Sequence, residues 1–344
     1  MKPLIGIIIP CYKANRFINN VIERIVKSTN LTREYALTKI YLVDDNCPNN
    51  SWKEVDKKFD LNIIKHTKNL GVGRASITGF KAAKKDNCDF FIKIDADGQH
   101  SPEYLTEIIL FLLTIQRHEL FILKGSRYHF YEKNIKVPLI RRIGSVLLEP
   151  MARMALNYRG LSDIANGYIA TNSLSLEYLL SNNIGTELSS RYLFESSILE
   201  KSCMFKCKIF QFPMAANYSR DWQSSMNSRA MIFPIINFWL LSIFRRLKNN
   251  YFLSLNLGSL LLILLFTSIL FTLKIYFKTI APNIAAQIFV SAGIATLFTS
   301  MITISIMLLL LFFFYDYNSS DKVKSVNFKF YLTDIEMQYK SKNR

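Results

Sequence analysis

The chain has 344 residues, half of them hydrophobic, and a formal net charge of +17; this length suits about two domains. It contains no recognised nucleic-acid-binding motif, and its positive charge lies beside long apolar segments. Anionic lipid headgroups and phosphate-bearing substrates therefore explain the charge better than nucleic acid does. The five cysteines are scattered and odd in number. They need no disulfide partners in a reducing cytoplasm, and Cys203 and Cys207 are too isolated for a zinc site.

Residues 1–228 alternate between strand-like and helix-like patterns. Continuous apolar runs predict strands, and apolar residues at helical spacing predict the helices between them. The expected strands cover residues 4–9, 40–43, 62–64, 89–94 and 120–123, and the expected helices cover residues 17–26, 73–85 and 102–115. This alternation predicts an α/β domain with a mainly parallel sheet and helices on both of its faces.

Polar residues follow four of the expected strands. They are Pro10, the pair Asp44 and Asp45, the segment 95–97, and the segment 125–127. Each set alone could be turn chemistry. Ligands of parallel sheets bind beyond the carboxyl ends of the strands, so four sets on one rim predict a binding site there.

Asp95 and Asp97 are separated by one residue and follow an apolar strand. Such a pair of carboxylates can hold Mg²⁺ or Mn²⁺ and leave coordination positions for substrate phosphates. A solvated acidic turn is the alternative. An EF-hand loop is excluded, because His100 stands where its glycine belongs and because a strand precedes the motif.

A glycine loop, residues 69–74, opens the helix expected over residues 73–85. It lacks the lysine of a Walker A loop and, with Ser76, the third glycine of a dinucleotide-binding loop. The loop could bind a phosphate at the helix N-terminus or could simply begin the helix.

Two long segments without charge, residues 249–273 and 279–315, each exceed the roughly 20 residues that span a bilayer. The alternative is a pair of buried core helices. Lysines and arginines flank the pair on both outer sides, which predicts that both termini lie in the cytoplasm. Residues 229–248 mix cations with apolar residues at helical spacing. They predict an amphipathic helix at the membrane surface, or alternatively a core helix.

The soluble part resembles family 2 glycosyltransferases of the GT-A fold. The resemblance rests on residues 7–12, 43–46, 69–75, 94–103, 125–128 and 163–168. The last three, together with two C-terminal spans, resemble the branch of dolichol-phosphate mannose synthase and bacterial polyprenyl-phosphate glycosyltransferases. This implies four parts: a cytosolic catalytic domain (1–228), the interfacial helix (229–248), a two-helix membrane hairpin (249–315) and a basic tail (316–344).

The resemblance also implies an inverting transfer from a nucleotide-diphosphate sugar to a polyprenyl phosphate at the cytoplasmic membrane. By this resemblance Asp95, Asp97 and Gln99 bind the metal, and Asp95, Asp97 and Arg127 are catalytic. The implied donor-binding residues are Pro10, Tyr12, Asp44, Asp45, Gly73 and Arg74. The implied ligands of the acceptor phosphate are Arg127, Arg141, Ser145 and Arg220.

The acceptor decides between two hypotheses. An ionised phosphate needs no general base, only cations that position it, whereas a sugar hydroxyl needs a carboxylate base. Glu195 could be that base, or could cap or salt-bridge a helix. A nucleotide-sugar-binding scaffold and a small channel are further alternatives. Spans without acidic residues make a poor ion pathway unless they oligomerise, and the sequence leaves open whether a homo-oligomer forms.

Overall fold

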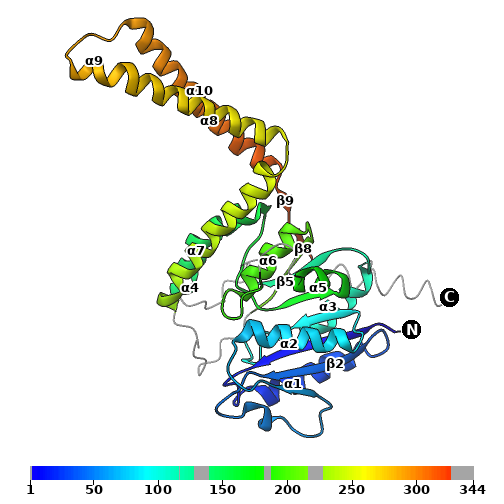
Figure 1. The fold of residues 1–344 in the computed structure, drawn as a ribbon. Helices are drawn as coiled ribbons and strands as arrows, with labels where there is room; N and C mark the ends of the chain where they lie inside the picture. Colours follow the sequence, from blue (N-terminus) through cyan, green and yellow to red (C-terminus); the bar gives the residue numbers. More distant parts are fainter. Residues whose placement is uncertain (1, 116, 128–138, 182–186, 216–227, 327–344) are drawn as a thin grey trace, which may run out of the picture. The chain divides into compact units, whose positions relative to one another are not determined.

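A computed structural model describes residues 2–115, 117–127, 139–181, 187–215 and 228–326, with only the backbone for 139–147, 228 and 229. The chain forms two compact units, Met1–Trp239 with Lys322–Arg344, and Leu240–Asp321. The first is an α/β unit built mainly on one sheet, as expected, and its strands β1 to β8 are drawn in Figure 1 in blue to green.

The sheet of the first unit has eight strands in the order β10-β8-β5-β7-β4-β1-β2-β3. All adjacent pairs are parallel except the two that involve β7. The strands are β1 (Leu4–Cys11), β2 (Leu37–Asp44), β3 (Asn62–Lys65), β4 (Phe90–Lys93), β5 (Phe121–Ser126), β7 (Ile169–Asn172), β8 (Lys208–Pro213) and β10 (Lys324–Ser325). A short pair, β6 (Tyr158–Arg159) with β9 (Asp321–Lys322), lies outside this sheet.

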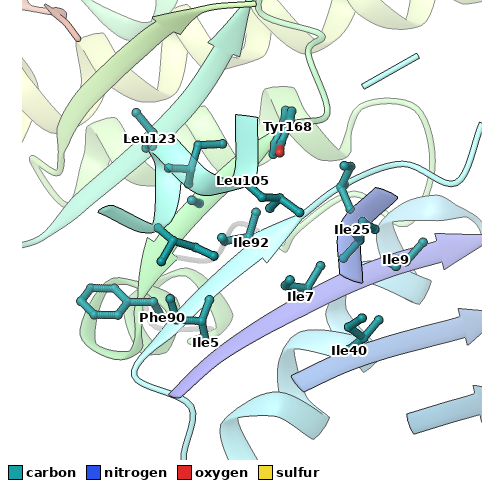
Figure 2. Close-up of a cluster of buried hydrophobic side chains, with 14 of the residues drawn as sticks. Ile5, Ile7, Ile9, Ile25, Ile40, Phe90, Ile92, Leu105, Leu123 and Tyr168 are labelled. Atoms are coloured by element: carbon teal, nitrogen blue, oxygen red, sulfur yellow. The ribbon is translucent and has the colours of Figure 1, made fainter. Parts of the chain in front are cut away.

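Helices cover both faces of the sheet because its strands are apolar on both sides. α1 (Ile18–Asn30) and α3 (Tyr104–Thr114) pack on the face that carries Ile5, Ile7 and Ile9 of β1. Figure 2 shows this core, with Ile25 of α1 and Leu105 of α3 against the strands. α2 (Val72–Lys85), α5 (Ser173–Leu180) and α6 (Phe194–Met204) pack on the face that carries Ile8.

Strand β1 continues through Pro10 to Cys11, two residues beyond the expected end. The pairing of β1 with β4 ends at Ile8 and Lys93, before Pro10, whereas the pairing of β1 with β2 continues past it. Pro10 has no N–H group, but no hydrogen bond is lost on the β4 side because β4 no longer pairs there.

β7 is an antiparallel strand between β4 and β5 that the sequence pattern did not predict. Ile169, its first residue, pairs with Lys93 at the end of β4 and with Lys124 near the end of β5. Because β7 starts where its two neighbours end, the segment 163–168 that precedes it lies at the carboxyl edge of the sheet.

The chain returns to the first unit after the apolar helices. Lys324 and Ser325 of β10 pair in parallel with Phe210 and Gln211 of β8, and the N–H of Val326 donates to the carbonyl of Gln211 over 2.9 Å. Val326 is 1% exposed and belongs to the core. The segment after the last apolar helix is thus an edge strand of the eight-stranded sheet.

The second unit is helical, with α8 (Leu257–Ile275), α9 (Ala281–Ala285), α10 (Ala292–Asn318) and the π-helical turns η2 (Lys248–Phe252) and η3 (Tyr276–Ile280). α7 (Ser228–Leu247) begins in the first unit and ends in the second. Ser268 of α8 and Ser305 of α10 hydrogen-bond over 2.9 Å, and Arg246 binds Asp316 through two contacts of 2.6 and 3.0 Å. These polar contacts join segments that are otherwise largely apolar.

The turn of the hairpin lies later than the sequence suggested. The sequence places the connection between the two uncharged segments, at residues 274–278, but Lys274 and Lys278 lie within the helical stretch Leu257–Ala285. The turn follows at residues 286–291. Two isolated lysines do not interrupt a helix, and Pro282 stands in the first turn of α9, where a proline is tolerated.

Three helical segments of the described chain are long and apolar enough to cross a membrane: Ala230–Phe252, Leu257–Ala285 and Ala292–Asn318. The protein is therefore membrane-associated. The first segment coincides with the helix expected at the membrane surface, and that assignment stays a prediction.

Candidate active site

Asp44 and Asp45 lie at the carboxyl end of β2 and have different surroundings. Asp45 is 2% exposed, and its carboxylate accepts the N–H groups of Leu70 and Gly71 over 2.9 and 2.7 Å. It also contacts Nδ1 of His66 over 2.8 Å. Asp45 thus holds the glycine loop in place. The Asp44 carboxylate accepts the N–H of Cys47 over 3.3 Å, and burial raises its pKa.

The glycine loop packs against the chain before α6. The N–H groups of Gly73 and Arg74 donate to the carbonyl of Ser190 over 2.9 and 3.1 Å. A side chain at Gly73 would collide with the carbonyl of Ser189. The start of α2 is therefore capped by backbone from residue 190, and the predicted contact of Gly73 with the donor stays a prediction. The Arg74 side chain is exposed.

Pro10 is buried at the end of β1, whereas Tyr12 is 40% exposed. Lys13 follows with a positive φ of 53°, and its ammonium lies 5.4 Å from the centre of the Tyr12 ring. Cys11, the residue before Tyr12, pairs with Asp44 at the end of β2, so the exposed Tyr12 ring lies at the same edge of the sheet as Asp44.

The predicted metal motif forms a turn directly after β4. The N–H of Gln99 donates to Oδ1 of Asp97 over 3.0 Å, which orients that carboxylate. His100 is buried, its Nδ1 accepts the N–H of Asp95 over 3.3 Å, and its ring lies 5.4 Å from that of Tyr168. Burial lowers the pKa of His100, which agrees with a neutral ring that accepts a hydrogen bond.

Asp95 is bound by a lysine that the sequence analysis did not single out. Lys93, the last residue of β4, is fully buried and donates to Oδ1 of Asp95 over 2.6 Å. The same ammonium reaches Oε1 of Glu195 over 3.1 Å and the carbonyl of Gly167 over 3.2 Å. A side chain at Gly167 would collide with Asp95 and Lys93, so only glycine lets the segment before β7 approach this closely.

Arg127 follows β5 and forms a buried ion pair with Asp163. The guanidinium donates from Nε and Nη2 to the two carboxylate oxygens over 2.8 and 2.5 Å, and the backbone N–H of Arg127 adds a third bond of 2.8 Å. Asn166 donates to Asp163 over 2.9 Å. Burial by itself raises the pKa of Asp163, but Arg127, Lys124 and Asn166 together outweigh burial and hold that pKa well below its ordinary value.

Lys124 of β5 holds the backbone beneath this pair. Its buried ammonium donates to the carbonyls of Gly125, Ser162 and Asp163 over 3.2, 2.9 and 2.6 Å. Burial lowers the pKa of Lys124 to about 8. Asp163 has a positive φ of 49°, and these bonds to its carbonyl and the preceding one hold that conformation.

The remaining predicted phosphate ligands are only partly described. Arg141 and Ser145 lie one turn apart on α4 (Leu139–Leu156), and their side chains lie outside the description. Arg220 lies outside the described residues. The convergence of Arg127, Arg141 and Arg220 on one phosphate therefore stays a prediction.

The residues after β4 fit a hard divalent cation. Asp95, Asp97 and Gln99 supply two carboxylates and one amide oxygen, the ligand types that Mg²⁺ and Mn²⁺ prefer. In the described part of the chain, no three His, Cys, Asp or Glu side chains gather around a common centre. Such a cation would therefore need further ligands from outside this set, as substrate phosphates can provide.

Residues 6–180 match the family model described as glycosyl transferase family 2. The chain therefore belongs to this family, and the predicted family and enzyme class, a glycosyltransferase, are confirmed. The mannosyl-3-phosphoglycerate synthase of Rubrobacter xylanophilus has the same fold, with a TM-score of 0.51 and 12% identity over 72% of this chain and 74% of that structure.

Two archaeal relatives are named as enzymes that transfer a sugar to dolichyl phosphate. The dolichol-phosphate mannosyltransferase of Pyrococcus furiosus is 28% identical over 195 residues, 56% of this chain and 52% of the relative. The UDP-N-acetylglucosamine–dolichyl-phosphate N-acetylglucosaminyltransferase of Methanococcus voltae is 28% identical over 189 residues, 50% of this chain and 67% of the relative. The chain thus spans about half the length of the first of these relatives.

Proposed function

We propose that this protein is a membrane-bound glycosyltransferase that moves a sugar from a nucleotide-diphosphate sugar to a polyprenyl phosphate on the cytoplasmic face of the membrane. The observation that carries the proposal is the carboxyl edge of the sheet. There the Asp95–Gln99 turn, Arg127 and the segment 163–168 come together between β4 and β5. The names of the two relatives support the same acceptor class.

The donor would lie across the ends of β1, β2 and β4. Tyr12 offers an exposed ring there, and Asp44 a buried carboxylate beside the same strand end. Asp97 and Gln99 would hold Mg²⁺ or Mn²⁺ together with Asp95. A divalent cation bound there would act as a Lewis acid toward the departing nucleoside diphosphate.

The charges near Asp95 favour a phosphate acceptor over a hydroxyl. A hydroxyl needs a free carboxylate as its base, and Glu195, the candidate from the sequence, is bound to the ammonium of Lys93. A polyprenyl phosphate is already ionised, so its oxygen can attack the anomeric carbon directly and invert it. The protein then has only to position the phosphate. Arg127 is the predicted phosphate ligand whose side chain the structure describes at this edge.

The return of the chain to the sheet supports a defined membrane topology. β10 pairs with β8 in the sheet that also contains β1 to β5, which supports placing the chain before α7 and the segment after α10 on one side of the membrane. An even number of crossings follows from that placement. We assign the two crossings to α8 and α10, and we assign the third apolar segment, Ala230–Phe252, to the membrane surface on the same side.

A direct assay tests the function. Membranes that contain the protein are incubated with a panel of labelled UDP- and GDP-sugars, and the lipids are extracted and analysed by mass spectrometry. We expect a sugar linked to a polyprenol through one phosphate, labile to mild acid and absent with the Asp97→Asn variant. A product in which the label is attached to a glycan hydroxyl would overturn the proposed acceptor.

A further inference from the structure

Lys93 is a buried charge that the proposed mechanism does not use. Lysine is almost never fully buried unless it is paired, and Lys93 is 0% exposed at the end of a strand whose other residues are apolar. An ammonium has three N–H groups, and the three acceptors Asp95, Glu195 and Gly167 match that number.

The ammonium of Lys93 lies between two carboxylates. It donates to one oxygen of Asp95 and to one oxygen of Glu195. The bond to Asp95 is the shorter of the two, at 2.6 Å against 3.1 Å. The positive charge of Lys93 therefore lies next to the Asp95 carboxylate, which is proposed to bind the cation. This charge opposes the binding of that cation.

Glu195 balances this charge. Glu195 is 8% exposed, lies in the first turn of α6, and accepts a hydrogen bond from the Lys93 ammonium over 3.1 Å. With three carboxylates and one ammonium, the group of Lys93, Asp95, Asp97 and Glu195 carries a net charge of about −2. This charge balances that of one divalent cation. Without Glu195, half of that charge would be lost.

We propose that Glu195 and Lys93 form a charge-setting pair for Asp95, in which Glu195 neutralises the ammonium and Asp95 keeps its negative charge for the cation. The inference rests on the metal site of the proposed function. It makes Glu195 a positioning residue that acts through Lys93, rather than a base that touches the acceptor. An ion pair with a purely structural role would stabilise α6 but would not change the affinity for the metal.

The signs of two substitutions follow. Glu195→Gln leaves Lys93 unopposed on Asp95, and we expect Mn²⁺ to bind about tenfold more weakly, since a unit charge a few ångströms away acts strongly in a partly buried site. Adding Lys93→Met to this variant removes the opposing charge. The double variant has the net charge of the wild type, and we expect its Mn²⁺ affinity to return to the wild-type value or to exceed it.

The experiment measures Mn²⁺ binding to the full-length protein in detergent, without donor, from the electron paramagnetic resonance signal of the free ion. Glu200→Gln is the matched control, because it removes a buried carboxylate from the same helix and should bind Mn²⁺ as the wild type does. Asp97→Asn tests the metal site itself and should lose binding.

Each outcome decides a separate point. Unchanged binding by Glu195→Gln, or no recovery in the double variant, overturns the charge-setting pair. Undiminished binding by Asp97→Asn overturns the metal site and with it the proposed function. Thermal unfolding of each variant is recorded beside the titration. If the double variant does not fold, Lys93→Gln with Glu195→Gln replaces it, because glutamine retains a donor for the carbonyl of Gly167.

Discussion

Asp163→Asn tests the best-defined ion pair of the proposed acceptor site. The Asp163 carboxylate is 2% exposed and the Arg127 side chain 12% exposed, and Asp163 accepts four hydrogen bonds, three from Arg127 and one from Asn166. The substitution keeps the size of the side chain but removes the charge. It leaves the guanidinium buried beside Lys124 without a carboxylate to neutralise it.

The expected loss is large. Removing one partner of a buried, hydrogen-bonded pair costs about 3–5 kcal/mol. For a unit of this size each kilocalorie lowers the unfolding midpoint by roughly 2–4 °C, so the midpoint should fall by about 10 °C. Since Asp163 also orients Arg127, the KM for the polyprenyl phosphate should rise while the KM for the donor stays near that of the wild type.

The assay is thermal unfolding of the full-length protein in detergent, followed by circular dichroism and repeated with steady-state kinetics. Asp56→Asn is the control, because Asp56 pairs with Lys58 at an exposed site where both side chains are more than 40% accessible; its midpoint should not change. An Asp163→Asn variant with wild-type stability and a wild-type acceptor KM would refute the reasoning.

The pair also predicts how stability depends on pH. The pKa of Asp163 is lower in the folded protein than its ordinary value, so its stabilising contribution is complete above the unfolded pKa, about 4, and is lost as the pH falls toward the lowered pKa. Stability of the wild type should decrease below about pH 4, and the decrease should be smaller in Asp163→Asn. Equal slopes in the two proteins would contradict this assignment.

Three further predictions concern the metal, the acceptor and the topology. Activity should require Mg²⁺ or Mn²⁺ and vanish with EDTA, and Asp97→Asn should lower turnover by several orders of magnitude without unfolding the protein; activity that survives either treatment rejects the metal site. Alanine at Arg127, Arg141 or Arg220 should cost on the order of ten- to a hundredfold in kcat/KM for the acceptor, the value of a charge-assisted contact, whereas Glu195→Gln at saturating Mg²⁺ should cost much less. The reverse pattern in acceptor kinetics would favour a hydroxyl acceptor. A protease-cleavable tag inserted after Gln287, in the turn between α9 and α10, should be cut by protease added outside intact cells, whereas the same tag at either terminus should be protected. Cleavage at either terminus would reject the topology.

Local patterns in the sequence determined the class of fold and located the residues of the candidate site along the chain. Apolar runs alternating with helical spacing predicted the parallel strands β1 to β5 to within a few residues. The polar residues after them predicted the edge at which Asp45, Asp95 and Arg127 now stand. This was possible because burial imposes a period on each element and because the ends of parallel strands share one edge.

Only the tertiary structure decided which charges meet. Glu195 lies 102 residues from Lys93, and Asp163 lies 36 residues from Arg127. A buried charge needs a partner close in space, but no periodicity in the sequence says which distant residue supplies it. The antiparallel strand β7 and the two-residue strand β10 are likewise too short or too irregular to leave a pattern. They nevertheless bring residues 163–168 to the candidate site and residues 324–326 back to the sheet.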